Sequence, residues 1–401
     1  MIERYSNRQL ALLQFNLLRS SGIFEEAVLK GSADSAGTLI LDLKGKGNFY
    51  RVPLKGDDAK GYLDLAVDPI ASNGLLLGIV CDHVWDEVVI IGKAKDKART
   101  ELPGVDIDKL GIRFVVYRYP RVGVQFIDLS GQSILLLDAD TFVTVSPSQG
   151  TEVVEYLSRF ERLPLEEVSA RRRKFRADKY KRQVQVLGAV LESIDTKTRV
   201  VLTSGAIDSS LWGVERTTYG GATGDATIDW PFVVKCKRLK HYPLRGQLNE
   251  VWCVPASLEM ILAFYCFDID QESIAKMLCL EMGGSVYEFD LKRIADLPGA
   301  LIVLSNYALT GSLRLAPSWE VFRNEIDAGR PIVDIIDGHA RTIAGYVSLS
   351  MHGQDILNGL VVFDPSPSTE GTIICWESVD RYEHLGAILS WEESAPQYSC
   401  P

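Results

Sequence analysis

The sequence lacks any apolar run long enough to cross a lipid bilayer. Its most apolar stretches, such as Gly74–Cys81 and Gly359–Phe363, are far shorter than the ~20 residues that a membrane-spanning helix needs. The first residues also lack the basic start and the unbroken apolar segment of a secretory signal peptide. We therefore expect a cytoplasmic protein that has no membrane partner.

Metal-binding and disulfide patterns are absent as well. No CxxC pair occurs, and the five histidines show no HxxxH spacing, so we expect no metal and no cofactor. The odd number of cysteines, scattered through a long chain, is typical of reduced thiols and not of a disulfide framework. The seven cysteines are Cys81, Cys236, Cys253, Cys266, Cys279, Cys375 and Cys400.

Positive charge is in short supply. The chain has 43 Lys and Arg against 53 Asp and Glu, which gives a net charge of -10 and argues against nucleic acid as a partner. Apolar residues make up 46% of the chain, an ordinary value for a globular protein that buries a core. A length of 401 residues favours two or three domains.

Residues 1–145 are predicted to form an N-terminal domain that is mostly β or α+β. Met1–Leu29 has apolar residues at helical spacing, and short strand-like runs follow it between turn-forming clusters. No phosphate loop or dinucleotide fingerprint occurs in this region, and the sequence does not indicate its function. The runs are Thr38–Leu43, Phe49–Val52, Leu75–Cys81, Val88–Ile91, Phe114–Tyr117, Val124–Leu129 and Ser133–Leu137.

Residues 146–204 are predicted to be a charged helical connector. Several glutamates precede the basic run Arg171–Lys174, and apolar residues recur between them at helical intervals. The run is either a patch for nucleic acid or an acidic partner, or a solvated helix face with opposite charges, and we favour the second interpretation. A Gly/Ser/Thr-rich linker at 205–230 follows, where a protease would cut most easily. Residues 231–401 are predicted to form a C-terminal domain.

Cys253 is the first candidate for chemistry. It stands in Arg245–Tyr265 (RGQLNEVWCVPASLEMILAFY), where the apolar spacing predicts a helix with Cys253 and Pro255 in its first turn. The positive end of a helix dipole favours the thiolate, which is the nucleophilic form of cysteine. The alternative is a small buried hydrophobic residue, which is the usual role of a free cysteine.

Three polar residues favour a catalytic Cys253 over a buried hydrophobic one. Gln247 could donate to the oxygen of a tetrahedral intermediate beside the backbone N–H of Cys253. His339, at the start of a predicted strand after Gly338, could act as general base and acid. Asp364, at the end of an apolar strand, could orient the imidazole. Their alternatives are a loop glutamine, an ordinary strand-end histidine and a turn-initiating aspartate. Asp337 is a poorer orienting residue, because neighbouring strand side chains point to opposite faces.

The rest of the C-terminal region predicts an α+β domain, in which a helix carrying Cys253 packs on an antiparallel sheet. Asp270–Leu280 and Ser318–Ala328 predict further helices, with Ile274, Met277 and Leu278 facing inward. Ser348–Asn358 could form a hairpin over the site, with His352 on its surface. Cys266 and Cys279 are expected to be buried and inert. The predicted strands include Ile332–Ile336, Thr342–Val347 and Leu360–Phe363.

Taken together, these residues resemble the papain-like cysteine peptidases. The segments that carry the resemblance are Gln247, Trp252–Ser257 (WCVPAS), Gly338–His339 and Phe363–Pro365, and they cover the last 170 residues or so. The order Gln, Cys, His, Asp is similar to that of the bacterial branch with bacteriocin-leader-processing peptidases and plant-pathogen effector cysteine proteases. Val254 and Pro255 depart from the aromatic or glycine residues that often follow the cysteine in this family.

The resemblance implies that Cys253 is the nucleophile, His339 the general acid and base, Asp364 the orienting carboxylate and Gln247 the oxyanion donor. We thus predict a cysteine endopeptidase that hydrolyses a peptide or protein substrate through a thioester, and the processing of a specific peptide or precursor is one such activity. One alternative is a transamidase or peptide ligase on the same fold. Another is a catalytically idle, peptidase-like binding protein. The sequence does not predict an oligomeric state.

Overall fold

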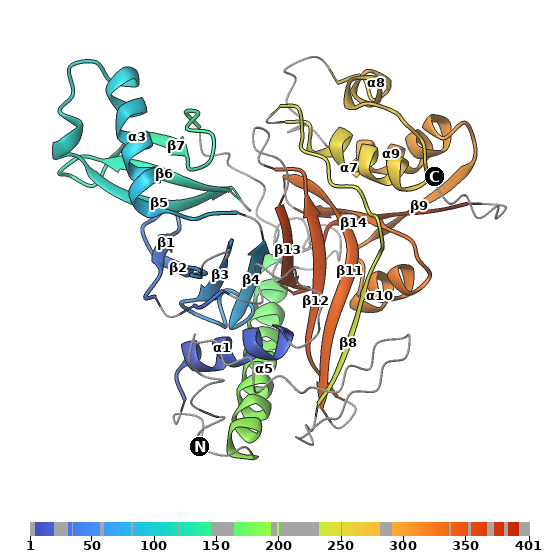
Figure 1. Cartoon of the computed structure of the whole chain (residues 1–401), viewed down its shortest axis with the longest axis horizontal. Coiled ribbons are helices and arrows are strands. Elements are labelled where there is room, and N and C mark those ends of the chain that lie inside the picture. The colour runs from blue at the N-terminus through green and yellow to red at the C-terminus, as the bar shows by residue number, and fades with distance from the viewer. Residues whose placement is uncertain are drawn as a thin grey trace. The chain divides into compact units, whose positions relative to one another are not determined.

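The computed structural model describes most of the chain, and its helices and strands form two compact units (Figure 1). The first unit is Met1–Asn16 with Glu25–Leu211, and the second is Leu17–Phe24 with Trp212–Pro401. The linker predicted at 205–230, Asp337 and His352 lie outside the described residues. The described residues are 5–19, 31–33, 35–56, 60–81, 83–118, 121–145, 164–193, 199, 232–249, 251–280, 291–336, 338–351, 354–366, 373–380 and 384–392.

The first unit is a sheet with helices, so the α+β prediction for it is confirmed. Its strands lie in the order β7-β6-β5-β1-β2-β3-β4, and all neighbours are antiparallel except the parallel pair β1 and β5. The strands are β1 (Thr38–Leu41), β2 (Gly47–Pro53), β3 (Gly61–Ala66), β4 (Leu76–Cys81), β5 (Gly111–Arg118), β6 (Arg121–Ile127) and β7 (Ser133–Asp138). The helices are α1 (Asn7–Arg19, counted with the second unit from Leu17 onward), α3 (Glu87–Glu101), the 3-10 turn η2 (Ile107–Lys109) and α5 (Leu165–Ser193).

The strand predicted at Val88–Ile91 is wrong, because these residues begin helix α3. The side chain of Asp86 caps the helix, accepting hydrogen bonds from the backbone N–H groups of Val88 at 3.0 Å and Val89 at 3.1 Å. Ile90, Ala94 and Ala98 then recur at intervals of four and are buried on one face. The short β-branched run concealed this longer helical period.

Helix α5 carries the basic run, and three of the basic residues on this helix make contacts within the first unit. Arg176 donates to the carbonyl of Ala71 at 2.9 Å, and Lys179 donates to the carbonyl of Asn73 at 3.1 Å. Arg171 pairs with Glu167 one turn earlier at 2.7 Å. These contacts favour a charge-laced helix face over a bare basic patch. The domain boundaries drawn from the sequence stay a prediction.

The second unit is an antiparallel sheet with helices, as predicted, and helix α9 among its described elements was not expected. Its strand order is β13-β12-β11-β10-β14-β9, and β8 also pairs with β11. The strands are β8 (Phe232–Arg238), β9 (Leu309–Leu315), β10 (Ile332–Ile336), β11 (His339–Met351), β12 (Gln354–Asp364), β13 (Ile373–Ser378) and β14 (Gly386–Glu392). The helices are α7 (Cys253–Phe264), α8 (Gln271–Met277), α9 (Leu291–Leu304) and α10 (Trp319–Asp327).

Strand β11 changes partner part-way along, and a glycine makes the change fit. Residues up to Ile343 pair with β10, and residues from Gly345 onward pair with β8. A Cβ atom on Gly345 would lie 2.6 Å from the carbonyl oxygen of Lys237, closer than real Cβ atoms approach. The absence of a side chain therefore lets β8 follow β11 past the end of β10.

Three expectations for the second unit are wrong. Residues 348–351 and 354–358 continue β11 and β12 as a paired hairpin. It therefore lies at the opposite end of β11 from His339, about 40 Å away at ~3.3 Å per residue, and does not cover the site. Cys266 and Cys279 are exposed, and Cys266 is disulfide-bonded and so is not a reduced thiol. Met277, expected to face inward, is 38% exposed, because it ends the short helix α8.

Candidate active site

Cys253 is the first residue of α7, as the spacing predicted. The N-terminal end of this helix is held by Trp252, which is 2% exposed and packs with Ala275 and Leu280. Cys253 itself is 7% exposed, so its thiol lies largely within the protein. A thiol at this position faces the positive end of the helix dipole.

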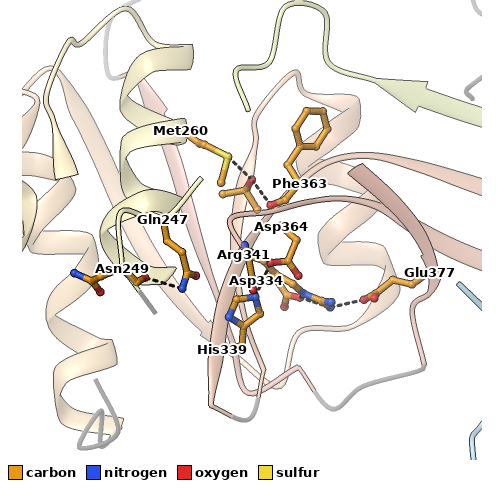
Figure 2. Close-up of polar contacts among 11 residues, drawn as sticks. Gln247, Asn249, Met260, Asp334, His339, Arg341, Phe363, Asp364 and Glu377 are labelled. Atoms are coloured by element: carbon orange, nitrogen blue, oxygen red, sulfur yellow. Dashed lines mark hydrogen bonds and ion pairs between the residues drawn. The ribbon is translucent and has the colours of Figure 1, made fainter. Parts of the chain in front are cut away.

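Helix α7 is fixed to the sheet by contacts with the strands that carry the other candidates. The Thr342 hydroxyl, on β11, donates to the carbonyl of Phe363 at 3.2 Å and contacts the sulfur of Met260 on α7 at 3.7 Å (Figure 2). Phe363, on β12, also packs edge-on against Tyr242, with ring centroids 4.9 Å apart. These contacts set the separation between α7 and the ends of β11 and β12.

His339 and Asp364 meet at those strand ends. The Nε2 atom of His339 lies 2.8 Å from Oδ1 of Asp364, and both side chains are buried (Figure 2). The same carboxylate oxygen accepts from the backbone N–H of Ser366 at 2.9 Å, which fixes the carboxylate. Because Nε2 is engaged, Nδ1 is the ring nitrogen that remains for Cys253, with which His339 forms a side-chain hydrogen bond.

The electrostatics of this cluster favour a charged imidazole. Burial alone would lower the pKa of His339, but the Asp364 carboxylate and the contact with Cys253 raise it to about 9. Burial would raise the pKa of Asp364, but the His339 charge, its hydrogen bonds and Arg341 bring it below its usual value. At neutral pH the His339–Asp364 pair is therefore ionised.

Gln247 lies in the loop before α7 and is 1% exposed. Its backbone N–H donates to the carbonyl of Pro365 at 2.9 Å, so the loop is joined to the residue that follows Asp364. Its side-chain Nε2 donates to the carbonyl of Asn249 at 2.8 Å, within the same loop (Figure 2). An amide nitrogen carries two hydrogens, so this bond engages one of them. The structure thus brings Gln247 to the end of β12, and the side-chain amide of Gln247 is hydrogen-bonded within its own loop.

A buried charge network next to this cluster was missed from the sequence. Arg341 donates to Oδ2 of Asp334 through Nε at 3.0 Å and Nη2 at 2.9 Å, and also pairs with Glu377 (Figure 2). His384 donates from Nε2 to the carbonyl of Val379 at 2.7 Å, while its Nδ1 faces Oδ1 of Asp334 at 2.7 Å. A carbonyl and a carboxylate only accept, so His384 carries both protons, and its raised pKa agrees with this.

This network connects to the candidate site through Arg341. Asp334 and Arg341 are directly opposite each other on β10 and β11, with side chains that are 0% exposed. The positive charge of Arg341 helps to lower the pKa of Asp364. Removing one partner of such a buried pair typically costs about 3–5 kcal/mol. The signal in the sequence is Asp334 inside the predicted strand Ile332–Ile336, with Arg341 directly before the predicted strand Thr342–Val347.

The described residues contain no group of three or more His, Cys, Asp or Glu side chains that could hold a metal ion. In this part of the chain, no helix combines the length and the apolarity needed to span a membrane.

The comparison with known proteins agrees with this geometry. Residues 239–397 match the sequence model of the Peptidase_C39 like family. The predicted resemblance to papain-like cysteine peptidases is thereby confirmed for the C-terminal region. No curated protein matches the chain.

Three solved peptidase structures are similar to part of this chain. The peptidase domain of Streptococcus ComA, a bi-functional ABC transporter involved in quorum sensing, is 19% identical, with a TM-score of 0.27, covering 38% of this chain and all of that one. A C39-like peptidase from Bacillus anthracis is 16% identical, with a TM-score of 0.27 and coverages of 40% and 100%. A double glycine motif protease from an AMS/PCAT transporter, solved with its leader peptide, is 17% identical, with a TM-score of 0.25 and coverages of 39% and 94%.

Proposed function

We propose that the second unit is a cysteine endopeptidase, with Cys253 as nucleophile, His339 as general acid and base, and Asp364 as the orienting carboxylate. The observation that carries the proposal is the position of the His339 ring. One nitrogen is fixed by Asp364, and the other is left for the thiol at the start of α7. This arrangement transfers a proton between sulfur and a substrate without moving the ring.

The proposed reaction has two stages. The Cys253 thiolate attacks the carbonyl carbon of a peptide, and the C=O electron pair moves to the oxygen. Gln247 and the backbone N–H of Cys253 are the proposed donors to that oxygen. The protonated Nδ1 of His339 then gives its proton to the amine as the C–N bond breaks, which leaves a thioester. Neutral Nδ1 next takes a proton from water, which attacks the thioester and releases the acid and the thiolate.

The proposed substrate is a peptide or protein chain, and the processing of a specific precursor would fit this site. The product identifies the reaction. Wild-type protein is incubated with a pool of synthetic peptides and with an excess of an amine that can act as acceptor. The products are analysed by mass spectrometry. Endopeptidase activity yields two fragments whose summed mass exceeds that of the substrate by one water. A fragment joined to the acceptor would instead identify transamidation. If none of the peptides yields a product that depends on Cys253, the proposal is contradicted.

The pKa of His339 predicts how hydrolysis depends on pH. The ring gains a proton below about pH 9 and loses it above, because its pKa is raised to about 9. Expulsion of the amine needs that proton, so kcat/KM for a peptide amide should fall as pH rises through about 9. Alkylation of Cys253 by iodoacetamide needs only the thiolate and should not fall over the same range. Parallel loss of both rates would contradict the role of His339 as acid.

A further inference from the structure

Gln271, the first residue of α8, is buried at 3% exposure, and all its amide hydrogen-bonding groups are engaged. Its Nε2 donates to the carbonyl of Gly246 at 2.8 Å and to Oε2 of Glu259 at 2.7 Å. Its Oε1 accepts from the backbone N–H of Leu248 at 3.0 Å. One side chain therefore satisfies the backbone on both sides of Gln247.

These bonds connect three parts of the candidate site. Glu259 belongs to α7, six residues after Cys253, so Gln271 joins the Gln247 loop to the helix that carries the thiol. On the other side, the backbone N–H of Gln247 is bonded to Pro365, next to Asp364. The loop is thus held between α7 and the end of β12. On the α7 side Gln271 binds the backbone next to Gln247, and Arg245 also pairs with Glu259 at 3.6 Å.

We propose that Gln271 is a positioning residue that holds Gln247 in place to stabilise the oxyanion of the reaction. This rests on the proposed cysteine peptidase function and extends it to a residue outside the Gln, Cys, His, Asp set. Without the amide of Gln271, the carbonyl of Gly246 and the N–H of Leu248 lose their partner, and the Gln247 backbone can shift. A displacement of about 1 Å at a group that contacts the transition state can lower a rate by about 10²-fold.

The test compares Gln271→Leu, the isosteric Gln271→Glu, Gln247→Ala and the double variant Q247A/Q271L with wild type. Asp270→Ala is the matched control. Asp270 caps the same helix, accepting from the N–H of Ser273 at 2.7 Å, and makes no bond to 246–248 that parallels those of Gln271. Three quantities are measured: kcat and KM for a peptide, the affinity for a peptide aldehyde, and the rate at which iodoacetamide alkylates Cys253. The aldehyde adds to the thiol and places an oxygen where the donors act, whereas alkylation uses no oxyanion donor.

We expect Gln247→Ala to lower kcat by about 10²–10³-fold. Both Gln271 variants should lower kcat and aldehyde affinity by about 10- to 100-fold, with KM and the alkylation rate unchanged. The double variant should resemble Gln247→Ala alone, because the two residues act through one group. Asp270→Ala should keep wild-type values of all three quantities.

Other results would overturn the inference. If the Gln271 variants bind the aldehyde as tightly as wild type does, or if their effects multiply with that of Gln247→Ala, Gln271 does not act through Gln247. Slowed alkylation in both Gln271 variants would indicate general damage to the site and would overturn it as well. If wild-type protein itself neither binds the aldehyde nor cleaves peptides, the proposed function fails, and the inference fails with it.

Discussion

Replacing Cys253 by alanine should lower kcat for peptide hydrolysis by about 10⁶-fold, the usual cost of removing a nucleophile from a catalytic unit. The residual rate would come from binding and oxyanion donors alone, because no thioester can form without the sulfur. Cys253 lies in the first turn of α7 with its thiol against His339, so the truncation removes one sulfur atom at a helix end. The measurement is the cleavage rate of a peptide that the wild type hydrolyses.

The control is Cys279→Ala, which removes the thiol of an exposed free cysteine two residues after α8. We expect this variant to keep wild-type activity. A Cys253→Ala protein that folds normally and retains more than a small fraction of the wild-type rate would show that another group attacks the peptide.

His339→Ala is expected to be comparably damaging to hydrolysis, with a loss of about 10⁶-fold in kcat. It should also slow the alkylation of Cys253 at neutral pH, because the thiolate loses the imidazolium that stabilises it. Raising the pH above the ordinary thiol pKa of about 8.5 should restore alkylation in this variant. Hydrolysis should not recover, because the acid that protonates the amine is gone.

The matched control for His339 is a histidine–carboxylate pair outside the candidate site. His83 and Asp140, in the first unit, are 3.2 Å apart and partly buried. His83→Ala should leave both hydrolysis and the alkylation of Cys253 at wild-type values. Equal alkylation of Cys253 in His339→Ala and wild type at pH 7 would contradict the pairing of thiol and imidazole.

The sequence predicted the elements of the second unit where local signals were strong. The apolar spacing and the first-turn Pro255 predicted the position of α7. Asp270 predicted the start of α8, and its side chain does cap that helix. The two strand runs around Gly338 are β10 and β11, and Gly338 has the positive φ of 67° that a tight connection needs. Helices and strands could thus be predicted from the sequence where caps, glycines and apolar periodicity agreed.

The sequence did not predict features that depend on pairing between distant residues. Strand β8 forms only because β11 extends past β10, and nothing in the sequence of 232–238 indicates this partner. The pairing of Arg341 with Asp334 was not predicted, because it depends on the antiparallel register of β10 and β11. The role of Gln271 was not predicted for the same reason, because its partners lie 12 to 25 residues earlier in the chain.

The central claim is that a buried thiol at the start of α7 is activated by His339, and alkylation measured at each free cysteine tests it most directly. Wild-type protein is treated with limiting iodoacetamide at pH 7, and labelling is quantified by peptide mass spectrometry. Exposure alone would favour Cys279, whereas activation favours Cys253, which is only 7% exposed. The account predicts that Cys253 is labelled first and that this preference is lost in His339→Ala. Labelling of Cys279 ahead of Cys253 in the folded wild type would contradict it.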